Sequence, residues 1–169
     1  PNGQKARIML EEVGLDYNLL AVDLAKLEFL DPAFLKISPT RRIPAIRDPD
    51  GPDGQPLCLV ESGVIANYLA EKVDSPLYPT DPGQRRLVDQ WALHGQATFG
   101  PLLSQSSLFE SRFDEDVPPA KAWYGEIGRR LYETIDLHLA GHEYFAGDYS
   151  VADIAHYTFV NRHKGQNID

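Results

Sequence analysis

The chain opens with apolar and polar side chains arranged at the period of a helix. Met9 and Val13 stand four residues apart, and charged residues lie between them. Because a helix repeats every ~3.6 residues, side chains at this spacing share one face, which can pack against a core. Gly14 follows, and glycine commonly ends helices, so we predict a helix over residues 4–13.

Three short apolar runs indicate strands. They lie at residues 17–23, 43–47 and 56–60. The segment 48–54, which joins the last two runs, is rich in Asp, Pro and Gly, so we predict that these strands form an antiparallel hairpin. Residues 31–34 read Asp-Pro-Ala-Phe, which is typical of a short helix with Asp at its cap and Pro in its first turn.

Apolar residues at helical spacing predict another helix at residues 62–72, and the composition changes directly after it. Prolines recur within residues 73–82, which is typical of a linker. We therefore expect an α/β domain at residues 1–72 and an all-helical domain at residues 83–169.

No segment beyond the linker has a convincing strand pattern. Residues 84–109 and 119–140 are long amphipathic patterns of helical period. Ser150, followed three residues later by Asp153, forms a variant of the capping box and predicts the start of a further helix. The chain is thus expected to be a small α/β unit followed by a helical unit.

The composition of the 169 residues is ordinary for a globular protein, with 43% apolar and 24% charged residues. The net charge of −9 repels phosphate backbones and anionic membranes, so we expect neither a nucleic acid nor a membrane as a partner. The apolar runs are far shorter than the roughly 20 residues of a membrane span. No signal-type segment opens the sequence, and we expect a cytoplasmic protein.

Cys58 is the single cysteine of the chain. One cysteine excludes an internal disulfide and a Cys-x-x-Cys redox motif, and it fits a reducing compartment. Cys58 stands in the run Leu57-Cys-Leu-Val60, so we expect its thiol to be inert and buried in the core.

Two parts of the predicted hairpin carry candidate chemistry, and the first is Ile43-Pro44. Proline lacks the N–H of a strand ladder, so an ordinary proline at a strand edge is one interpretation. The other interpretation is a cis peptide bond. It would kink the chain and leave the amide and carbonyl of Ile43 facing outward, where an extended peptide can add.

The second part is Glu61-Ser62, where the last strand leads into a helix. Serine at a helix start is commonly an N-cap. The free N–H groups and the positive dipole end at such a position can also bind a carboxylate, and Glu61 beside it can take an ammonium group. The second interpretation describes a site for an amino-acid headgroup, and both stay open at this point.

His138 and His142 have the i, i+4 spacing of a zinc pair. Gly141 intervenes near the expected helix end, and no zinc signature containing Glu surrounds the pair. We therefore expect no metal.

Several motifs stand together in the order of a known family. They are Pro1-Asn-Gly-Gln-Lys5, Asp31-Pro-Ala-Phe-Leu-Lys-Ile-Ser-Pro39, Ile43-Pro-Ala-Ile46, Glu61-Ser-Gly-Val-Ile65 and Phe145-Ala-Gly-Asp-Tyr-Ser-Val-Ala-Asp-Ile154. With the order of the elements, they resemble the glutathione transferase family, most specifically bacterial nu-class members and their disulfide-bond oxidoreductase relatives. The resemblance implies a thioredoxin-like α/β N-terminal domain and an all-α C-terminal domain. It also implies that the first strand and the C-terminal helices of the family are missing from this sequence.

The resemblance assigns glutathione, as co-substrate, to the two parts of the hairpin. Ile43 would bond the cysteinyl backbone of glutathione across the kink made by Pro44. Glu61 and Ser62 would hold the ammonium and the carboxylate of its γ-glutamyl group.

Three further positions follow from the resemblance. Arg42, or Arg41 in its place, would meet the glycyl carboxylate, and Gln105 would reach across a dimer to the neighbouring ligand. Asn2 is the implied catalytic residue, because its amide and the helix N-terminus would lower the thiol pKa from its usual value of about 8.5. In the family, a Thr or Ser immediately before Pro1 shares this task.

The implied function is that of a glutathione-dependent transferase or disulfide-bond reductase, acting as a homodimer. The thiolate would attack a small electrophile, or it would reduce a disulfide or a peroxide. The Asn2 signature favours reduction, whereas residues 122–125 lack the Arg that assists the reductase relatives. The alternative is a non-enzymatic interaction module, because domains of this family also act as platforms in regulatory proteins.

Overall fold

The computed structural model describes residues 1–166, in which the chain forms two compact units, Pro1–Ser75 (unit 1) and Pro76–Asp169 (unit 2). Unit 1 contains both strands and helices, and the named elements of unit 2 are all helical. Within the described residues, no helix has both the length and the apolar composition that crossing a membrane requires.

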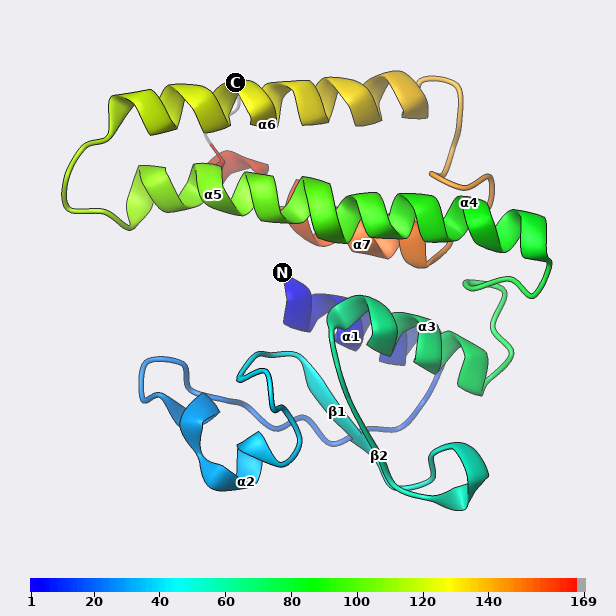
Figure 1. Cartoon of the computed structure of the whole chain (residues 1–169). Coiled ribbons are helices and arrows are strands. Elements are labelled where there is room, and N and C mark those ends of the chain that lie inside the picture. The colour runs from blue at the N-terminus through cyan, green and yellow to red at the C-terminus, as the bar shows by residue number, and fades with distance from the viewer. Residues whose placement is uncertain (167–169) are drawn as a thin grey trace. The chain divides into compact units, whose positions relative to one another are not determined.

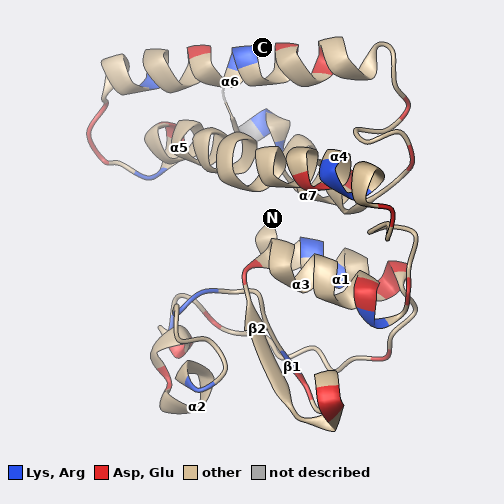
Figure 2. Ribbon diagram, turned by 45° about the vertical axis from the view of Figure 1, so that its right-hand side comes forward, with Lys and Arg blue, Asp and Glu red and all other residues tan. Residues whose placement is uncertain are grey.

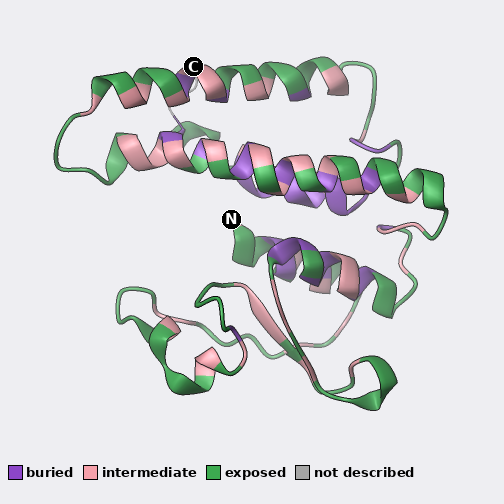
Figure 3. Cartoon of the chain, viewed as in Figure 1, coloured by how far each residue is buried: buried purple, intermediate pink, exposed green. Residues whose placement is uncertain are grey.

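Unit 1 combines a two-stranded hairpin with helices (Figure 1). Its elements are α1 (Asn2–Glu12), the 3-10 turn η1 (Glu28–Leu30), α2 (Pro32–Leu35), β1 (Ala45–Asp48), the 3-10 turn η2 (Pro52–Gly54), β2 (Leu57–Val60) and α3 (Ser62–Lys72). Helices α1 and α3 pack side by side and run in the same direction (Figure 1). Met9 on α1 and Ile65 on α3 are completely buried and belong to the core of this unit. Figure 3 shows buried positions on both helices.

Local signals in the sequence set the bounds of two helices. Gly14 follows α1 at φ +68°, a conformation that glycine adopts without a Cβ clash, and its N–H donates to Glu11 O at 3.2 Å. At α2, Asp31 Oδ1 accepts from Ala33 N at 2.7 Å and caps the helix. Both predicted helices are confirmed, α1 with bounds shifted slightly toward the N-terminus.

The predicted hairpin is also confirmed. β1 and β2 are antiparallel, and Ala45 lies opposite Val60 in their register. Gly51 is required in the connecting turn, because its N–H donates to Gln55 O at 3.0 Å and a Cβ there would lie 2.6 Å from that oxygen. The turn therefore closes only around a residue without a side chain.

The predicted strand at residues 17–23 is wrong, because this segment has no strand pairing. Leu19 and Leu20 within it are 70% and 81% exposed. A strand needs a neighbour for its backbone hydrogen bonds, and in the described part of the chain β1 and β2 pair only with each other. Strand propensity is visible in the residues, but the presence of a pairing partner is not.

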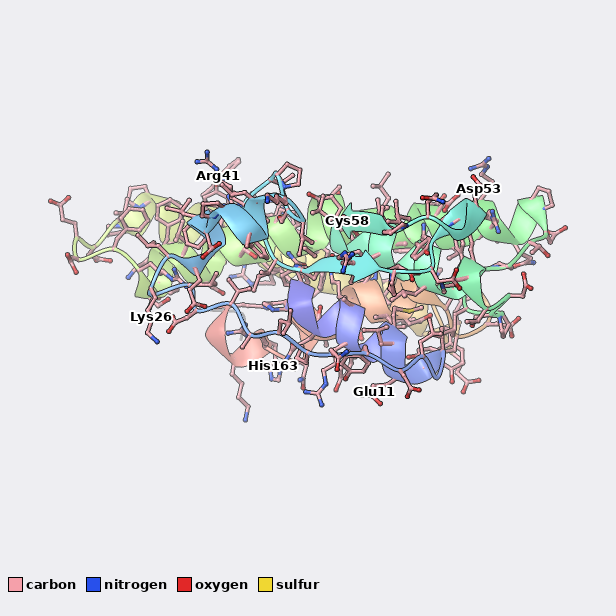
Figure 4. All side chains as sticks on the ribbon, turned by 90° about the horizontal axis from the view of Figure 1, so that it is seen from below. Glu11, Lys26, Arg41, Asp53, Cys58 and His163 are labelled. Atoms are coloured by element: carbon pink, nitrogen blue, oxygen red, sulfur yellow. The ribbon has the colours of Figure 1, made fainter. Side chains whose placement is uncertain are left out.

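Cys58 is exposed, which corrects the expectation of a buried thiol. On β2 the flanking Leu57 and Leu59 are half-buried, while Cys58 lies on the other face and opposite the exposed Arg47 (Cys58 is labelled in Figure 4). Successive side chains of a strand point to opposite faces, and a continuous apolar run does not show which face is covered.

The elements of unit 2 are α4 (Pro82–Leu93), the π-helical turn η3 (His94–Phe99), α5 (Gly100–Ser111), α6 (Pro118–Leu139), α7 (Val151–Val160) and the 3-10 turn η4 (His163–Gly165). α4 packs on α7, and α5 packs on α6. The predicted helical pattern at residues 119–140 corresponds to α6, and the pattern at 84–109 corresponds to α4, η3 and α5 in sequence.

The π-helical turn between α4 and α5 is not visible in the hydrophobic pattern. Pro101 has no N–H to donate to the carbonyl four residues earlier, so regular α-helical bonding is interrupted there. Gly100 beside it has no room for a side chain, because a Cβ would lie 2.4 Å from a ring carbon of Phe159 on α7. The glycine therefore allows α5 to approach α7 closely.

The predicted capping box at the start of α7 is confirmed. Ser150 N donates to Asp153 Oδ2 at 2.9 Å, and Ala152 N donates to Ser150 Oγ at 3.3 Å. Asp153 Oδ1 also accepts from Phe145 N at 3.1 Å, so the same carboxylate holds the preceding loop.

Two histidines that are distant in sequence meet in the core of unit 2. His94 Nδ1 lies 2.9 Å from His156 Nε2, and His156 Nδ1 lies 2.9 Å from Ala152 O. A neutral His156 that donates to the carbonyl through Nδ1 accepts from His94 through Nε2. Burial lowers the pKa of His94, which favours the same neutral arrangement.

Candidate functional site

One end of the hairpin gathers residues that are distant in sequence. Because Ala45 lies opposite Val60, Ile43-Pro44 before β1 and Glu61-Ser62 after β2 lie at the same end of the hairpin. Helices α1 and α3 also both begin on this side of unit 1 (Figure 1). We define the site end of unit 1 as Asn2, Ile43-Pro44 and Glu61-Ser62.

The peptide bond between Ile43 and Pro44 is cis. Of the two interpretations of this proline, the structure therefore contains the cis form. Ile43 is 38% exposed and precedes the first residue of β1, so its backbone amide and carbonyl lie outside the hairpin register.

Ser38, which the sequence analysis did not single out, holds the loop that leads to Ile43. Its Oγ donates to Arg42 O at 2.8 Å and accepts from Arg42 N at 3.2 Å. The Ser38 side chain is completely buried. The buried hydroxyl thus fixes the backbone immediately before the cis peptide.

Glu61 is held in an unusual backbone conformation, with φ 68° and ψ 112°. A residue with a Cβ is strained at positive φ by roughly 1–3 kcal/mol, and such strain tends to persist at functional sites. The side chain is exposed, and Figure 2 shows an acidic position where β2 leads into α3. Glu61 thus presents its carboxylate to solvent directly beside a helix N-terminus.

Ser62 is the first residue of α3 and is buried, whereas Glu61 occupies the N-cap position. No side chain within residues 1–166 caps this helix. The capping interpretation of Ser62 therefore does not describe its position. Ser62 and the first N–H groups of α3 stand at the positive end of the helix dipole, where an anion is favoured.

Asn2 is the exposed first residue of α1. Gln4 N and Lys5 N donate to Pro1 O at 2.9 and 3.3 Å, which closes the first turn, and no side chain in the described part of the chain caps α1. The Asn2 amide therefore stands beside a second uncapped helix N-terminus.

Arg41, Arg42 and Gln105 are the remaining residues that the resemblance assigns to the site. Arg42 and Arg41 are both exposed next to Ile43, and Arg41 has φ 57°. Gln105 is half-buried on α5 and belongs to unit 2. Arg42 and Arg41 thus both lie in the chain just before the site end of unit 1, whereas Gln105 lies in unit 2.

Lys5 is a second residue that the sequence analysis did not single out. It lies one turn after Asn2 and is only 2% exposed. Burial lowers its pKa to about 8. The signal was present in the sequence, because Lys5 falls on the same helical stripe as the apolar Met9, four residues later.

His138 and His142 stack with their ring centroids 4.4 Å apart. His138 Nε2 lies 2.9 Å from Phe145 O, and His142 Nδ1 lies 2.8 Å from His138 O. These bonds direct one N–H of each ring to a backbone carbonyl. Residues 1–166 contain no group of three or more side chains arranged to hold a metal ion.

Known proteins resemble the chain throughout its length. Residues 1–72 match the family described as "Glutathione S-transferase, N-terminal domain". The disulfide-bond oxidoreductase YfcG of Escherichia coli is 40% identical over the whole of this chain, which spans 79% of YfcG.

Solved structures of glutathione transferases are also similar to the chain over nearly its whole length. A glutathione transferase from Pseudomonas putida, with one glutathione disulfide bound per subunit, has a TM-score of 0.91 and 40% identity over 96% of this chain and 71% of its own. One from Burkholderia graminis, with two glutathione molecules per subunit, has a TM-score of 0.93 and 38% identity over 98% of this chain and 70% of its own.

The chain belongs to the glutathione S-transferase family. The expected family and fold class are confirmed. The names of these relatives also bear out the expectation of a glutathione-dependent transferase or disulfide-bond reductase as the functional class.

Proposed function

We propose that this protein binds glutathione at the site end of unit 1 and uses its thiolate to reduce disulfides or to attack small electrophiles. The observation that carries the proposal is the strained, exposed Glu61 beside the uncapped start of α3. A γ-glutamyl group carries an ammonium and a carboxylate on one carbon, and this arrangement offers a partner to each. The glutathione and glutathione disulfide bound in the relatives support the same ligand.

Each part of glutathione has a proposed partner. Glu61 accepts from the ammonium, and Ser62 with the first N–H groups of α3 donates to the γ-glutamyl carboxylate. The backbone of Ile43 bonds the cysteinyl residue beside Pro44, as an added strand would. Arg42 meets the glycyl carboxylate.

The thiol is proposed to ionise next to Asn2. The side-chain amide donates to sulfur, and the N-terminus of α1 contributes partial positive charge. Each pKa unit by which the thiol is lowered corresponds to about 1.4 kcal/mol in favour of the thiolate. Asn2 is accordingly the proposed catalytic residue.

Reduction is the preferred reaction in this proposal, supported by the 40% identity to YfcG over the whole chain. The glutathione thiolate attacks one sulfur of a substrate disulfide, forms a mixed disulfide and expels the second sulfur as a thiolate, which takes a proton. A second glutathione thiolate then attacks the mixed disulfide, which yields glutathione disulfide and the reduced substrate. Two glutathione molecules thus supply the two electrons, and Cys58 is not required.

The proposal includes a homodimer in the reducing cytoplasm. A homodimer is what the resemblance to the glutathione transferase family implies. Gln105 is proposed to reach the ligand of the neighbouring subunit. Light scattering during size-exclusion chromatography tests the assembly, and a monomer that still binds glutathione would remove Gln105 from the site.

Calorimetric titration of the chain with glutathione and with glutathione disulfide tests the proposal. Ser62→Ala and Glu61→Ala are each expected to weaken binding about tenfold or more, because a hydrogen bond to a charged group is lost. The matched controls are Ser111→Ala on α5, whose hydroxyl bonds its own helix, and Glu71→Ala at the opposite end of α3. Both controls are expected to bind like the parent.

The outcomes separate the alternatives. Tighter binding of glutathione disulfide supports reduction, and preference for glutathione supports conjugation. Normal binding by both site variants would overturn the site. Absence of binding to either ligand would favour an interaction module instead.

A further inference from the structure

Lys5 occupies a position in α1 that ordinarily holds an apolar residue. The buried stripe of this helix consists of Lys5, Ala6 and Met9. Asn2 lies on the same stripe one turn earlier, where the helix begins, and it is exposed. Along one face, α1 thus passes from an exposed amide at its start to a buried ammonium in the next turn.

The geometry of a helix directs this side chain toward the site end. Every Cα–Cβ bond tilts toward the helix N-terminus, so a long side chain covers the turn that precedes its own Cα. For Lys5 the preceding turn is that of Asn2. Side chains three residues apart also lie within roughly 5–6 Å at their Cβ atoms.

A buried ammonium at this position is unfavourable for the fold and useful for a nearby anion. Desolvation lowers the pKa of Lys5 to about 8, so the group is still mostly protonated at neutral pH. Its charge acts through a medium of lower dielectric than water, which makes its field at the helix start stronger than that of an exposed lysine. The field has the same sign as the positive end of the α1 dipole.

We propose that Lys5 is a positioning residue that acts through the first turn of α1 to favour the thiolate of glutathione bound beside Asn2. The inference rests on the proposed function. When the thiol ionises at neutral pH, its proton passes to solvent water, and Lys5 stays mostly an ammonium. Lys5 thus supplies a fixed charge and does not serve as a proton acceptor.

The thiolate absorbs in the ultraviolet, so a pH titration of the glutathione–protein complex measures the ionisation of the bound thiol. Lys5→Met keeps the length of the side chain and removes its charge. We expect it to raise the pKa of the bound thiol by about one unit, which lowers the ratio of thiolate to thiol at a given pH about tenfold. Lys5→Arg, which keeps the charge, is expected to retain the parental titration.

Lys72→Met is the matched control, because it removes the same charge at the last residue of α3, ten residues after Ser62. It is expected to leave the titration of the bound thiol unchanged. Calorimetry on every variant reports glutathione affinity separately. If the unmodified protein binds no glutathione, the proposed function itself is contradicted.

Three results would overturn the role of Lys5 while leaving the proposed function standing. One is a Lys5→Met variant that binds glutathione and titrates like the parent. The second is a Lys5→Arg variant whose thiol pKa rises by about one unit although its charge is retained. The third is a shift of equal size in Lys72→Met, which would reflect net charge alone. If Lys5→Met does not fold, Lys5→Gln, which also removes the charge, takes its place in the titration, and a parental thiol pKa in that variant would overturn the role of Lys5.

Discussion

The two ends of the hairpin in unit 1 use their polar side chains in opposite ways. At the far end, which we define as Asp48, Tyr68 and Lys72, the groups bond one another: Asp48 Oδ2 accepts from Tyr68 Oη at 2.5 Å and from Lys72 Nζ at 2.7 Å. At the site end, no side chain among the described residues caps α3, and Glu61 is exposed at positive φ. Polar groups bonded internally stabilise a fold, whereas strained and open ones remain available to a ligand.

The ionisation of the far end agrees with a structural role. Burial raises the pKa of Asp48, but hydrogen bonds from Lys72 and Tyr68 outweigh it, and the net shift is downward. The carboxylate is therefore stabilised in its charged form by the fold itself. Figure 2 shows acidic residues at the hairpin turn and at the end of α3, but only the internal bonds distinguish this end from the site end.

Glu61→Gly is expected to have the largest effect on the contrast between the two ends of the hairpin. Glycine tolerates positive φ, so part of the roughly 1–3 kcal/mol of strain is relieved and Tm rises. Loss of the carboxylate weakens glutathione binding about tenfold to a hundredfold, because a charge-assisted hydrogen bond is removed. Thermal unfolding and calorimetry measure the two effects.

Asp74→Gly is the control for Glu61→Gly. Asp74 also has positive φ, 52°, but lies just beyond the C-terminal end of α3. It is expected to raise Tm without changing binding. Equal affinity of Glu61→Gly and Asp74→Gly for glutathione would show that Glu61 only shapes the backbone.

Ser38→Ala is expected to have the next largest effect. The variant loses both hydrogen bonds to the backbone of Arg42 and leaves that amide and carbonyl without the buried hydroxyl, at a cost of about 1–2 kcal/mol. Tm should fall by roughly 2–8 °C, and glutathione should bind more weakly because the loop before Ile43 is less well held. Unchanged Tm would show that the buried hydroxyl contributes little.

Asp48→Asn is expected to lower stability and leave glutathione binding unchanged, which is the opposite of Glu61→Gly. Weakening the bonds from Tyr68 and Lys72 lowers the free energy of unfolding by about 1 kcal/mol and Tm by about 2–4 °C. Glutathione affinity should remain that of the parent, since the change lies at the far end. A loss of affinity as large as in Glu61→Gly would mean that the two ends are not separate in function.

The smallest expected effect is a loss of stability in weak acid, which acts through the His94–His156 pair of unit 2. The pKa of His94 is lowered in the folded state, so the unfolded state binds more protons as the pH falls. The contribution of His94 is therefore present above its ordinary pKa of about 6.5 and is lost below it. His94→Gln should flatten the dependence of Tm on pH between about 5 and 7.

The lowered pKa of Asp48 acts in a separate window. Its contribution is present above the ordinary pKa of Asp, about 3.9, and is lost as the pH falls through the still lower value in the folded protein. Asp48→Asn should therefore alter the pH dependence of Tm only in stronger acid. A change confined to neutral pH would contradict this assignment.

Sequence reasoning located the elements that depend on near neighbours. The bounds of α3, the cap at Asp31 and the capping box of Ser150 with Asp153 all rest on residues within one helical turn of each other. The hairpin followed from turn residues between two apolar runs. These signals are local, so the tertiary fold did not alter them.

Sequence motifs identified the residues of the site end, but they did not predict the conformations of these residues. That Glu61 has positive φ, and that Ser62 is the first helical residue instead of the cap, depends on how β2 meets α3. The burial of Lys5 depends on what covers the stripe of α1 on which it lies. A pattern of residue types shows which side chains share a face, but not what lies against that face.

The sequence by itself determined the family, the hairpin with most of the helices, and the residues that lie at one end of the hairpin. Only the tertiary structure decided that residues 17–23 form no strand, that Cys58 faces outward and that His94 meets His156, 62 positions away. Caps, glycine turns and helical period act between residues a few positions apart. Strand pairing, the choice of covered face and side-chain contacts across the core require partners that only the folded chain supplies.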